Sequence, residues 1–228
     1  MALSIHYDIM SQPSRSVLLF CEVNNISYEK EITTISSGDN QADEFKAINP
    51  MGRVPAMKDG DFTLTESEAI LKYLVNKYKT PDHWYPSDPL KKAKVDEYLA
   101  WHHANTRTHC IRVFWTEVLI PKMKGRDVDQ KKLAEALQLL DGTLSLLENM
   151  FLKDQPFLCG DDITLADLMA VPEFMQLTAA ARNPFPNQPK LTAWLERVKS
   201  RLQPKFDEFH TPIYKMKQKR LKDTKANL

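Results

Sequence analysis

The sequence lacks the features of exported and membrane-spanning proteins. Its three cysteines, Cys21, Cys110 and Cys159, are scattered and contain no C-x-x-C pair, which excludes a disulfide framework and predicts reduced thiols in the cytoplasm. No apolar run approaches the roughly 18 residues of a membrane span. The first ten residues do not combine a basic segment with a long apolar one, so we expect no signal peptide.

The chain also carries almost no net charge. Its 31 Lys and Arg residues balance 30 Asp and Glu residues, giving a formal net charge of +1. With no overall field to attract polyanions, we expect neither a nucleic acid nor a membrane as a partner. One local exception is the basic tail, residues 215–228, whose composition predicts a solvated or disordered end. A nuclear or anionic-membrane address is the alternative for this tail.

Residues 1–80 predict a small domain in which strands and helices alternate. Residues 3–7 and 28–33 have strand patterns. Between them, residues 14–24 place their apolar side chains on one helical face, and residues 43–48 form a short helix or turn after the second strand. Their order along the chain is β, α, β, followed by the short helix. This is the first half of a βαβ-ββα arrangement.

The second half of this domain begins with a hairpin. Asp59-Gly60 separates two short apolar segments and is a strong hairpin signal. Thr65 and Glu68 have the spacing of a capping box and predict the start of the next helix. The complete βαβ-ββα order, with a proline at the first hairpin strand, predicts an α+β thioredoxin-like domain with a mixed sheet.

A second, all-helical domain is expected over residues 88–228. The polar, proline-rich residues 81–87 predict a linker, and Asp88-Pro89 is a cap followed by proline at the first helical position. An apolar stripe runs from Leu133 to Phe151, and two further helix signals follow it, the Thr164–Asp167 capping box and the amphipathic segment 189–202. Pro172 is expected to kink or end the helix that the capping box opens.

A serine precedes the first expected helix. Ser11, in the segment DIMSQPSRSVLLF, has the position of an N-cap whose hydroxyl accepts a backbone N–H, and capping alone would explain it. A functional role requires a second group, elsewhere in the chain, that brings an anionic substrate to the same helix end. The rest of the first domain contains candidates for such a group.

The Val54–Pro55 bond is the first candidate. Proline is the residue that tolerates a cis peptide bond at low cost. If this bond is cis, the Val54 backbone presents its N–H and C=O to an extended peptide lying along the sheet edge.

Polar residues on either side of this bond extend the candidate site. Glu66 and Ser67 open the next expected helix, where unpaired N–H groups favour a carboxylate and Glu66 can accept an ammonium group. Arg53, with Asn40 and Gln41 in a polar loop, can bind a second carboxylate. The predicted ligand is a peptide with a free α-amino acid head and a distant carboxylate.

The motifs of the chain resemble those of the cytosolic glutathione transferases, and most closely the theta class. The segments that carry the resemblance span nearly the whole chain and read MSQPSR, NPMGRVPAMKDGDFTLTESEAILKYL, WYPSDP, VDEYLAWHH and ITLADL. The resemblance implies the glutathione transferase fold and an enzyme that conjugates glutathione to small hydrophobic electrophiles for detoxification. Alkyl halides, epoxides, peroxides and sulfate esters are the implied acceptors.

The resemblance also implies roles for the candidate residues. The γ-glutamyl end of glutathione is assigned to Glu66 and Ser67, the cysteinyl backbone to Val54 before cis Pro55, and the glycyl end to Asn40, Gln41 and Arg53. In theta-like enzymes the serine of this motif, here Ser11, donates a hydrogen bond to the glutathione sulfur. Tyr7 is the alternative, because other classes use a tyrosine at the end of the first strand.

Specific sequence signals are fewer for the residues that bind the electrophilic acceptor than for those that bind glutathione. The resemblance places Arg107 near glutathione and the acceptor, whereas a surface salt bridge is the alternative for this residue. Plausible apolar walls of the acceptor pocket are Met10, Ile35, Ile111 and Trp115. Three histidines, His102, His103 and His109, lack the spacing of a chelating pair, so no metal is expected.

Two classes of function remain open at this point. One is an enzyme with glutathione as co-substrate and no cofactor. The other is a non-catalytic carrier or interaction module that keeps the glutathione transferase fold. The joint presence of Ser11, Arg53, Glu66 and Ser67 favours the enzyme, because a carrier needs no thiol-activating hydroxyl. The resemblance further implies a homodimer.

Overall fold

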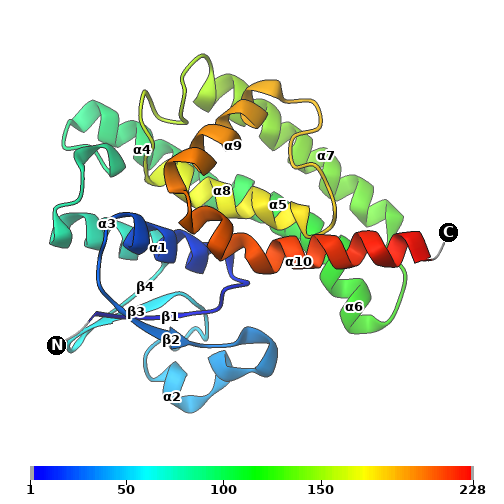
Figure 1. Cartoon of the computed structure of the whole chain (residues 1–228), viewed down its shortest axis with the longest axis horizontal. Coiled ribbons are helices and arrows are strands. Elements are labelled where there is room, and N and C mark those ends of the chain that lie inside the picture. The colour runs from blue at the N-terminus through cyan, green and yellow to red at the C-terminus, as the bar shows by residue number, and fades with distance from the viewer. Residues whose placement is uncertain (1–2, 227–228) are drawn as a thin grey trace.

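A computed structural model describes residues 3–226, with side chains described to residue 223. A four-stranded sheet lies at the N-terminal end of the molecule, below a larger group of helices (Figure 1). The strands are β1 (Leu3–Tyr7), β2 (Glu29–Ile32), β3 (Ala56–Asp59) and β4 (Phe62–Thr65), in the order β2-β1-β3-β4. β2 is parallel to β1, and the other pairs are antiparallel. The predicted mixed sheet of a thioredoxin-like arrangement is confirmed.

The helices of this first region lie on both sides of the sheet. α1 (Gln12–Val23) and α3 (Ser67–Tyr78) lie between the sheet and the other helices, while α2 (Asp43–Lys46) lies on the opposite side (Figure 1). Two short 3-10 turns, η1 (Ile35–Ser37) and η2 (Asp39–Gln41), precede α2. Ten of the twelve residues of α1 are buried, because this helix is covered from both sides.

The remaining elements form a second, helical region, residues 82–226, and surround one buried helix. α8 (Leu165–Thr178) is buried along its whole length and contacts α1 of the first region. The elements around it are η3 (Asp82–Trp84), α4 (Pro89–His102), η4 (His103–Arg107), α5 (Thr108–Phe114), η5 (Trp115–Leu119), α6 (Ile120–Lys124), α7 (Gln130–Leu146), η6 (Leu147–Leu152), α9 (Pro189–Leu202) and α10 (Lys205–Ala226). None of the described helices has the length and apolar composition needed to cross a membrane.

Several local signals act as the sequence predicts. Asp88 caps α4 by accepting the N–H groups of Leu90 and Lys91. Thr164 and Asp167 form the expected capping box at the start of α8. The Asp167 carboxylate is fully buried and also accepts the indole N–H of Trp194 at 2.8 Å, which ties α9 to α8.

The capping box expected at Thr65 and Glu68 is wrong. Thr65 is the last residue of β4, and the N-cap of α3 is Glu66, whose side chain makes no capping hydrogen bond. Glu68 instead pairs with Lys72 and His103. The motif fails because hairpin pairing of β4 extends one residue further than the apolar pattern indicates, and this leaves the first N–H groups of α3 without a side-chain cap.

The expected break at Pro172 is also not observed as an end of the helix. α8 continues through Pro172 to Thr178. Proline removes one donor from a helix, so the carbonyl one turn earlier needs another partner. Ser16 of α1 donates its hydroxyl to that carbonyl, on Leu168, at 3.0 Å. The neighbouring helix thereby satisfies the group that proline leaves free.

The tail after Tyr214 was expected to be solvated or disordered; its described side chains are mostly exposed, as for a solvated end, but its described backbone is helical. α10 runs from Lys205 to Ala226, and residues 227 and 228 of the tail lie outside the described residues. Ile213 of this helix is fully buried, and Met216 packs beside it. The helix forms because these apolar residues, three positions apart, share one face that the lysine-rich composition obscures.

Candidate functional site

Three chain segments meet at one end of the sheet, where β1 and β4 finish and β3 begins. In the strand register, His6 of β1 and Thr65 of β4 both pair with Ala56 at the start of β3. The loop after β1, the Val54–Pro55 bond before β3 and the start of α3 after β4 are therefore neighbours. These segments carry the predicted thiol-activating serine and two of the predicted peptide-binding groups.

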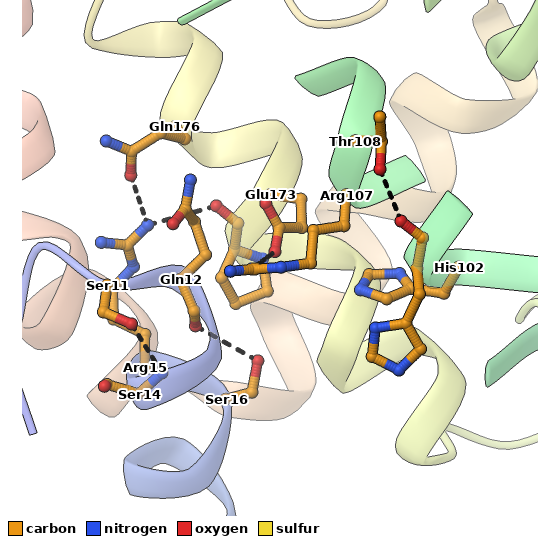
Figure 2. Close-up of polar contacts among 12 residues, drawn as sticks. Ser11, Gln12, Ser14, Arg15, Ser16, His102, Arg107, Thr108, Glu173 and Gln176 are labelled. Carbon is orange, nitrogen blue, oxygen red and sulfur yellow. Dashed lines mark hydrogen bonds and ion pairs between the residues drawn. The ribbon is translucent and has the colours of Figure 1, made fainter. Parts of the chain in front are cut away.

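Ser11 caps α1 and lies against the second of these segments. Its hydroxyl oxygen accepts the Ser14 N–H at 3.4 Å, which confirms its predicted capping role (Figure 2). The same hydroxyl donates to the Val54 carbonyl at 3.5 Å, the long limit for a hydrogen bond. A thiolate within reach is a stronger acceptor than this carbonyl, because hydrogen bonds to charged groups are shorter and stronger.

Asp8 holds the loop that carries Ser11. Its carboxylate accepts the N–H groups of Met10 and Ile35, both at 2.8 Å. Its carbonyl accepts the Ser11 N–H at 2.9 Å. Asp8 is 7% exposed. The loop is thereby fixed to the segment after β2 by hydrogen bonds that Asp8 accepts.

The Val54–Pro55 peptide bond is cis, as predicted. The Val54 N–H makes no hydrogen bond to any other residue between 3 and 226, and the only donor on its carbonyl is Ser11. An extended peptide can therefore pair with this backbone as an additional strand.

The start of α3 has the features of a carboxylate site. Glu66 has φ of +66°, a backbone conformation that is uncommon for any residue other than glycine. Since the Glu66 side chain does not cap the helix, the N–H groups of Ser67 and the next residues face outward along the helix dipole. The exposed Glu66 carboxylate forms no ion pair within residues 3–226, so it is available to an ammonium group.

Asn40 and Gln41 lie beside Arg53, and their contacts pass through Gly52. The Asn40 and Gln41 side chains donate to the Gly52 carbonyl at 2.7 and 3.5 Å. Asn49 donates to the Arg53 carbonyl at 2.6 Å. The amides therefore order the backbone, and the exposed Arg53 guanidinium, which has no ion-pair partner among the described residues, is the free cation of this loop.

Arg107 lies in the second region and points toward the first. It forms an ion pair with Glu173 of α8, and its guanidinium lies between Glu173 and the start of α1 (Figure 2). The Arg107 side chain is 31% exposed, whereas Glu173 is 1% exposed. Burial raises the pKa of Glu173, and the Arg107 charge opposes this shift. The predicted salt bridge exists, but its carboxylate partner is buried.

The predicted apolar walls do not form one cluster. Met10 packs against a small apolar cluster of Phe114, Ala179 and Ile213, here called the Ile213 cluster. The other predicted wall residues lie outside this cluster; Ile111 is half-buried, and Ile35 and Trp115 are 47% and 46% exposed. Their part in an acceptor pocket stays a prediction. Ile213 was not predicted from the sequence, although its three-residue spacing to Met216 is a signal for it.

The three histidines have other partners. His102 is fully buried beside the Tyr98 hydroxyl, and burial lowers its pKa to about 3, so the ring is neutral. His103 pairs with Glu68, which raises the pKa of His103. His109 contacts the Thr143 hydroxyl at 2.6 Å. In the part of the chain that the structure describes, no group of three His, Cys, Asp or Glu residues is placed to hold a metal ion.

Two glycines with positive φ, Gly52 and Gly38, differ in how closely other atoms approach them. Gly52 has φ of +62°, and a Cβ there would lie 2.7 Å from the Gln41 amide nitrogen and 2.9 Å from the Asn40 carbonyl. Gly38 has φ of +87° with nothing within 4 Å of the same position. Both substitutions strain the backbone, but only one adds a clash.

We therefore expect Gly52→Ala to lower the free energy of unfolding by about 3 kcal/mol and Gly38→Ala by about 1 kcal/mol. Urea denaturation of both variants measures the difference. Equal losses would contradict the close approach of Asn40 and Gln41 to Gly52.

Two family models match the chain. Residues 6–82 match the N-terminal domain of glutathione S-transferases, and residues 111–201 match their C-terminal domain. Human glutathione S-transferase theta-1 is 45% identical over 218 residues, covering 95% of this chain and 91% of the relative. Glutathione S-transferase theta-3 of Mus musculus is 44% identical, with coverage of 95% and 90%.

Solved structures agree with these sequence matches. The apo form of human glutathione S-transferase T1-1 has a TM-score of 0.90 and 44% identity, covering 95% of this chain and 91% of its own. A human theta-class enzyme in complex with the glutathione conjugate of 1-menaphthyl sulfate has a TM-score of 0.91 and 42% identity, covering 98% and 92%. The chain thus belongs to the glutathione S-transferase family and is similar over nearly its whole length to the theta class.

Proposed function

We propose that this glutathione transferase binds glutathione along the sheet edge formed by Val54, Glu66 and Ser67, and activates its thiol with Ser11. The observation that carries the proposal is the position of the Ser11 hydroxyl, 3.5 Å from the Val54 carbonyl. A peptide whose cysteinyl backbone pairs with Val54 brings its side chain to the N-terminus of α1. The α-amino acid head then reaches Glu66 and Ser67, and the glycyl carboxylate reaches Arg53.

Thiol activation requires a modest change in acidity. A free thiol has a pKa of about 8.5 and is mostly protonated at neutral pH. Lowering it by about two units requires roughly 2.7 kcal/mol of differential interaction with the thiolate. A hydroxyl donor and the N-terminus of α1 together supply interactions of this size.

The proposed acceptors are small hydrophobic electrophiles, including alkyl halides, epoxides, peroxides and sulfate esters. The complex of the human theta-class relative with the glutathione conjugate of 1-menaphthyl sulfate supports the last class. The reaction uses glutathione as co-substrate and needs no further cofactor. We place the enzyme in the cytoplasm, which is consistent with its free cysteines Cys21, Cys110 and Cys159.

Replacing Ser11 separates activation from binding. We expect Ser11→Ala to retain glutathione binding, because Val54, Glu66 and Ser67 hold the peptide independently of its sulfur. Loss of a hydrogen bond to the thiolate costs about 1.5 to 3 kcal/mol, or roughly 10- to 150-fold in conjugation rate. Ultraviolet absorbance of the bound thiolate, titrated against pH, measures the effect. Normal turnover in Ser11→Ala together with an inactive Tyr7→Phe would assign activation to Tyr7 instead.

Arg107 is proposed to stabilise leaving groups that depart as anions, because a fixed cation helps most where charge develops. We expect Arg107→Ala to lower kcat/KM for 1-menaphthyl sulfate by about 100-fold and for an epoxide much less. The substitution also leaves buried Glu173 unpaired, which destabilises the fold. The ratio of the two kcat/KM values is the relevant measure, since a loss of folded protein lowers both equally. An unchanged ratio would make Arg107 a structural residue or a ligand of glutathione.

We further propose a symmetric homodimer in which the first region of one subunit rests on the helices of the other. Large apolar side chains are exposed on both regions, with Phe62 on β4 at 47% and Leu90 on α4 at 79%. Sedimentation at micromolar concentration should give twice the 26.3 kDa chain mass. A single species of the chain mass would contradict the dimer.

A further inference from the structure

A fully buried arginine connects the Ser11 loop to the second region of the molecule. Arg15 lies in the first turn of α1 and is 0% exposed. Its Nη2 donates to the Gln176 side-chain oxygen at 2.7 Å and to the Pro172 carbonyl at 3.2 Å, both on α8 (Figure 2). Its Nη1 donates in the other direction, to the Ile9 carbonyl at 2.9 Å. One guanidinium therefore fixes two backbone segments that are 163 residues apart in sequence (Ile9 to Pro172).

The Ile9 carbonyl is a significant attachment point. Ile9 lies between Asp8 and Ser11, in the loop whose geometry sets the position of the Ser11 hydroxyl. Asp8 holds this loop from the side of η1, through the N–H groups of Met10 and Ile35. Arg15 holds it from the side of α8. The loop is thus fixed on both sides, and its attachment to the second region passes through Arg15.

The local hydrogen bonds of Ser11 alone position its hydroxyl weakly. The bonds of this hydroxyl to the Ser14 N–H and the Val54 carbonyl are 3.4 and 3.5 Å long. Both lie beyond the usual range for strong hydrogen bonds. The short contacts that order the loop are made by Asp8 and Arg15, through the backbone, and this is where its geometry is determined.

The electrostatic surroundings keep Arg15 charged in its buried position. Burial lowers the pKa of Arg15 to about 10, while the carboxylates of Glu173 and Asp8 oppose this shift. Glu173 is also the ion-pair partner of Arg107. Because a planar guanidinium offers donors in two directions at once, arginine suits this position better than lysine does.

We propose that Arg15 is a positioning residue for thiol activation: by joining the Ile9 carbonyl to α8, it fixes the Ser11 hydroxyl at the place where the glutathione sulfur binds. The inference rests on the proposed role of Ser11. Arg15 does not touch the sulfur in this arrangement and acts through the loop backbone. Thiol acidity therefore depends on the attachment of α1 to α8, in addition to the groups at the sheet edge.

Two substitutions weaken this attachment while preserving the size and charge of the site. Gln176→Met removes the acceptor of the 2.7 Å hydrogen bond, and the Gln176 side chain makes no hydrogen bond to Ser11, Val54, Glu66 or Ser67. Arg15→Lys keeps the positive charge but cannot donate in both directions with the same geometry. Ser16→Ala is the matched control, because Ser16 also joins α1 to α8, through the Leu168 carbonyl at 3.0 Å, and its other hydrogen bond, to the Gln12 carbonyl at 3.4 Å, stays within α1.

The experiment is a pH titration of thiolate absorbance with bound glutathione, together with kcat, KM for glutathione and Tm for each variant. We expect Gln176→Met and Arg15→Lys to raise the pKa of the bound thiol and to lower kcat about 10-fold, with KM for glutathione changed by less than about twofold. Ser16→Ala should lower Tm and leave the thiol titration unchanged.

Two results would overturn the inference while leaving the proposed function intact. One is a lower Tm with an unchanged thiol titration in Gln176→Met and in Arg15→Lys, which would make Arg15 purely structural. The other is an equal shift of the thiol pKa in Ser16→Ala, which would assign the effect to general packing of α1 on α8. If Ser11→Ala itself fails to shift the thiol pKa, both the proposed activation step and the inference are wrong. Should Arg15→Lys not fold, Gln176→Met decides between these outcomes.

Discussion

The packing of α1 against α8 is the contact on which the rest of the structure depends. α8 is buried along its length, and α1 is buried in ten of its twelve residues, so each helix forms much of the environment of the other. Their interface is polar at the N-terminus of α1, where Arg15 and Ser16 donate to α8 carbonyls. Pro172 makes this possible, because it frees the Leu168 carbonyl for Ser16. The same contact places the start of α1, and with it Ser11, beside Arg107 and Glu173.

The fold could be predicted largely from local sequence. Strands, the Asp59-Gly60 hairpin, the Asp88 cap and the Thr164–Asp167 capping box are encoded within a few residues, and each is observed. The failed capping box at Thr65 has a local cause, the pairing of β4 with β3, whereas two other errors arose where a distant partner decides the local structure. α8 continues through Pro172 because Ser16 of α1 donates to the Leu168 carbonyl. α10 forms because Ile213 packs against Phe114 and Ala179. Neither partner is visible in a window of ten or fifteen residues.

The candidate site also has residues that local sequence predicts and residues that only the tertiary structure reveals. Ser11, Val54 and Ser67 stand in short motifs, and the register of β1, β3 and β4 then brings those motifs to one edge of the sheet. The supporting residues were missed, because Arg15 and Gln176 are 161 residues apart and lie in segments that read as ordinary amphipathic or buried helix. A charged residue in the first turn of a helix, just before the apolar run Val17 to Cys21, was the available signal for Arg15. A fully buried Arg15 needs acceptors, and only the tertiary structure shows which ones it has.

The charged groups of the site occupy two different environments, and this has a consequence for the effect of salt. Arg53 and Glu66, which are proposed to bind the two ends of glutathione, are exposed, whereas Arg15 and Glu173 are buried. At physiological ionic strength the screening length is about 8 Å, and it acts on exposed charges far more than on buried ones. Added salt therefore weakens the capture of glutathione while leaving the electrostatics around the start of α1 nearly constant. Ionic strength would change the concentration of glutathione that the enzyme requires much more than the rate at which the bound molecule reacts.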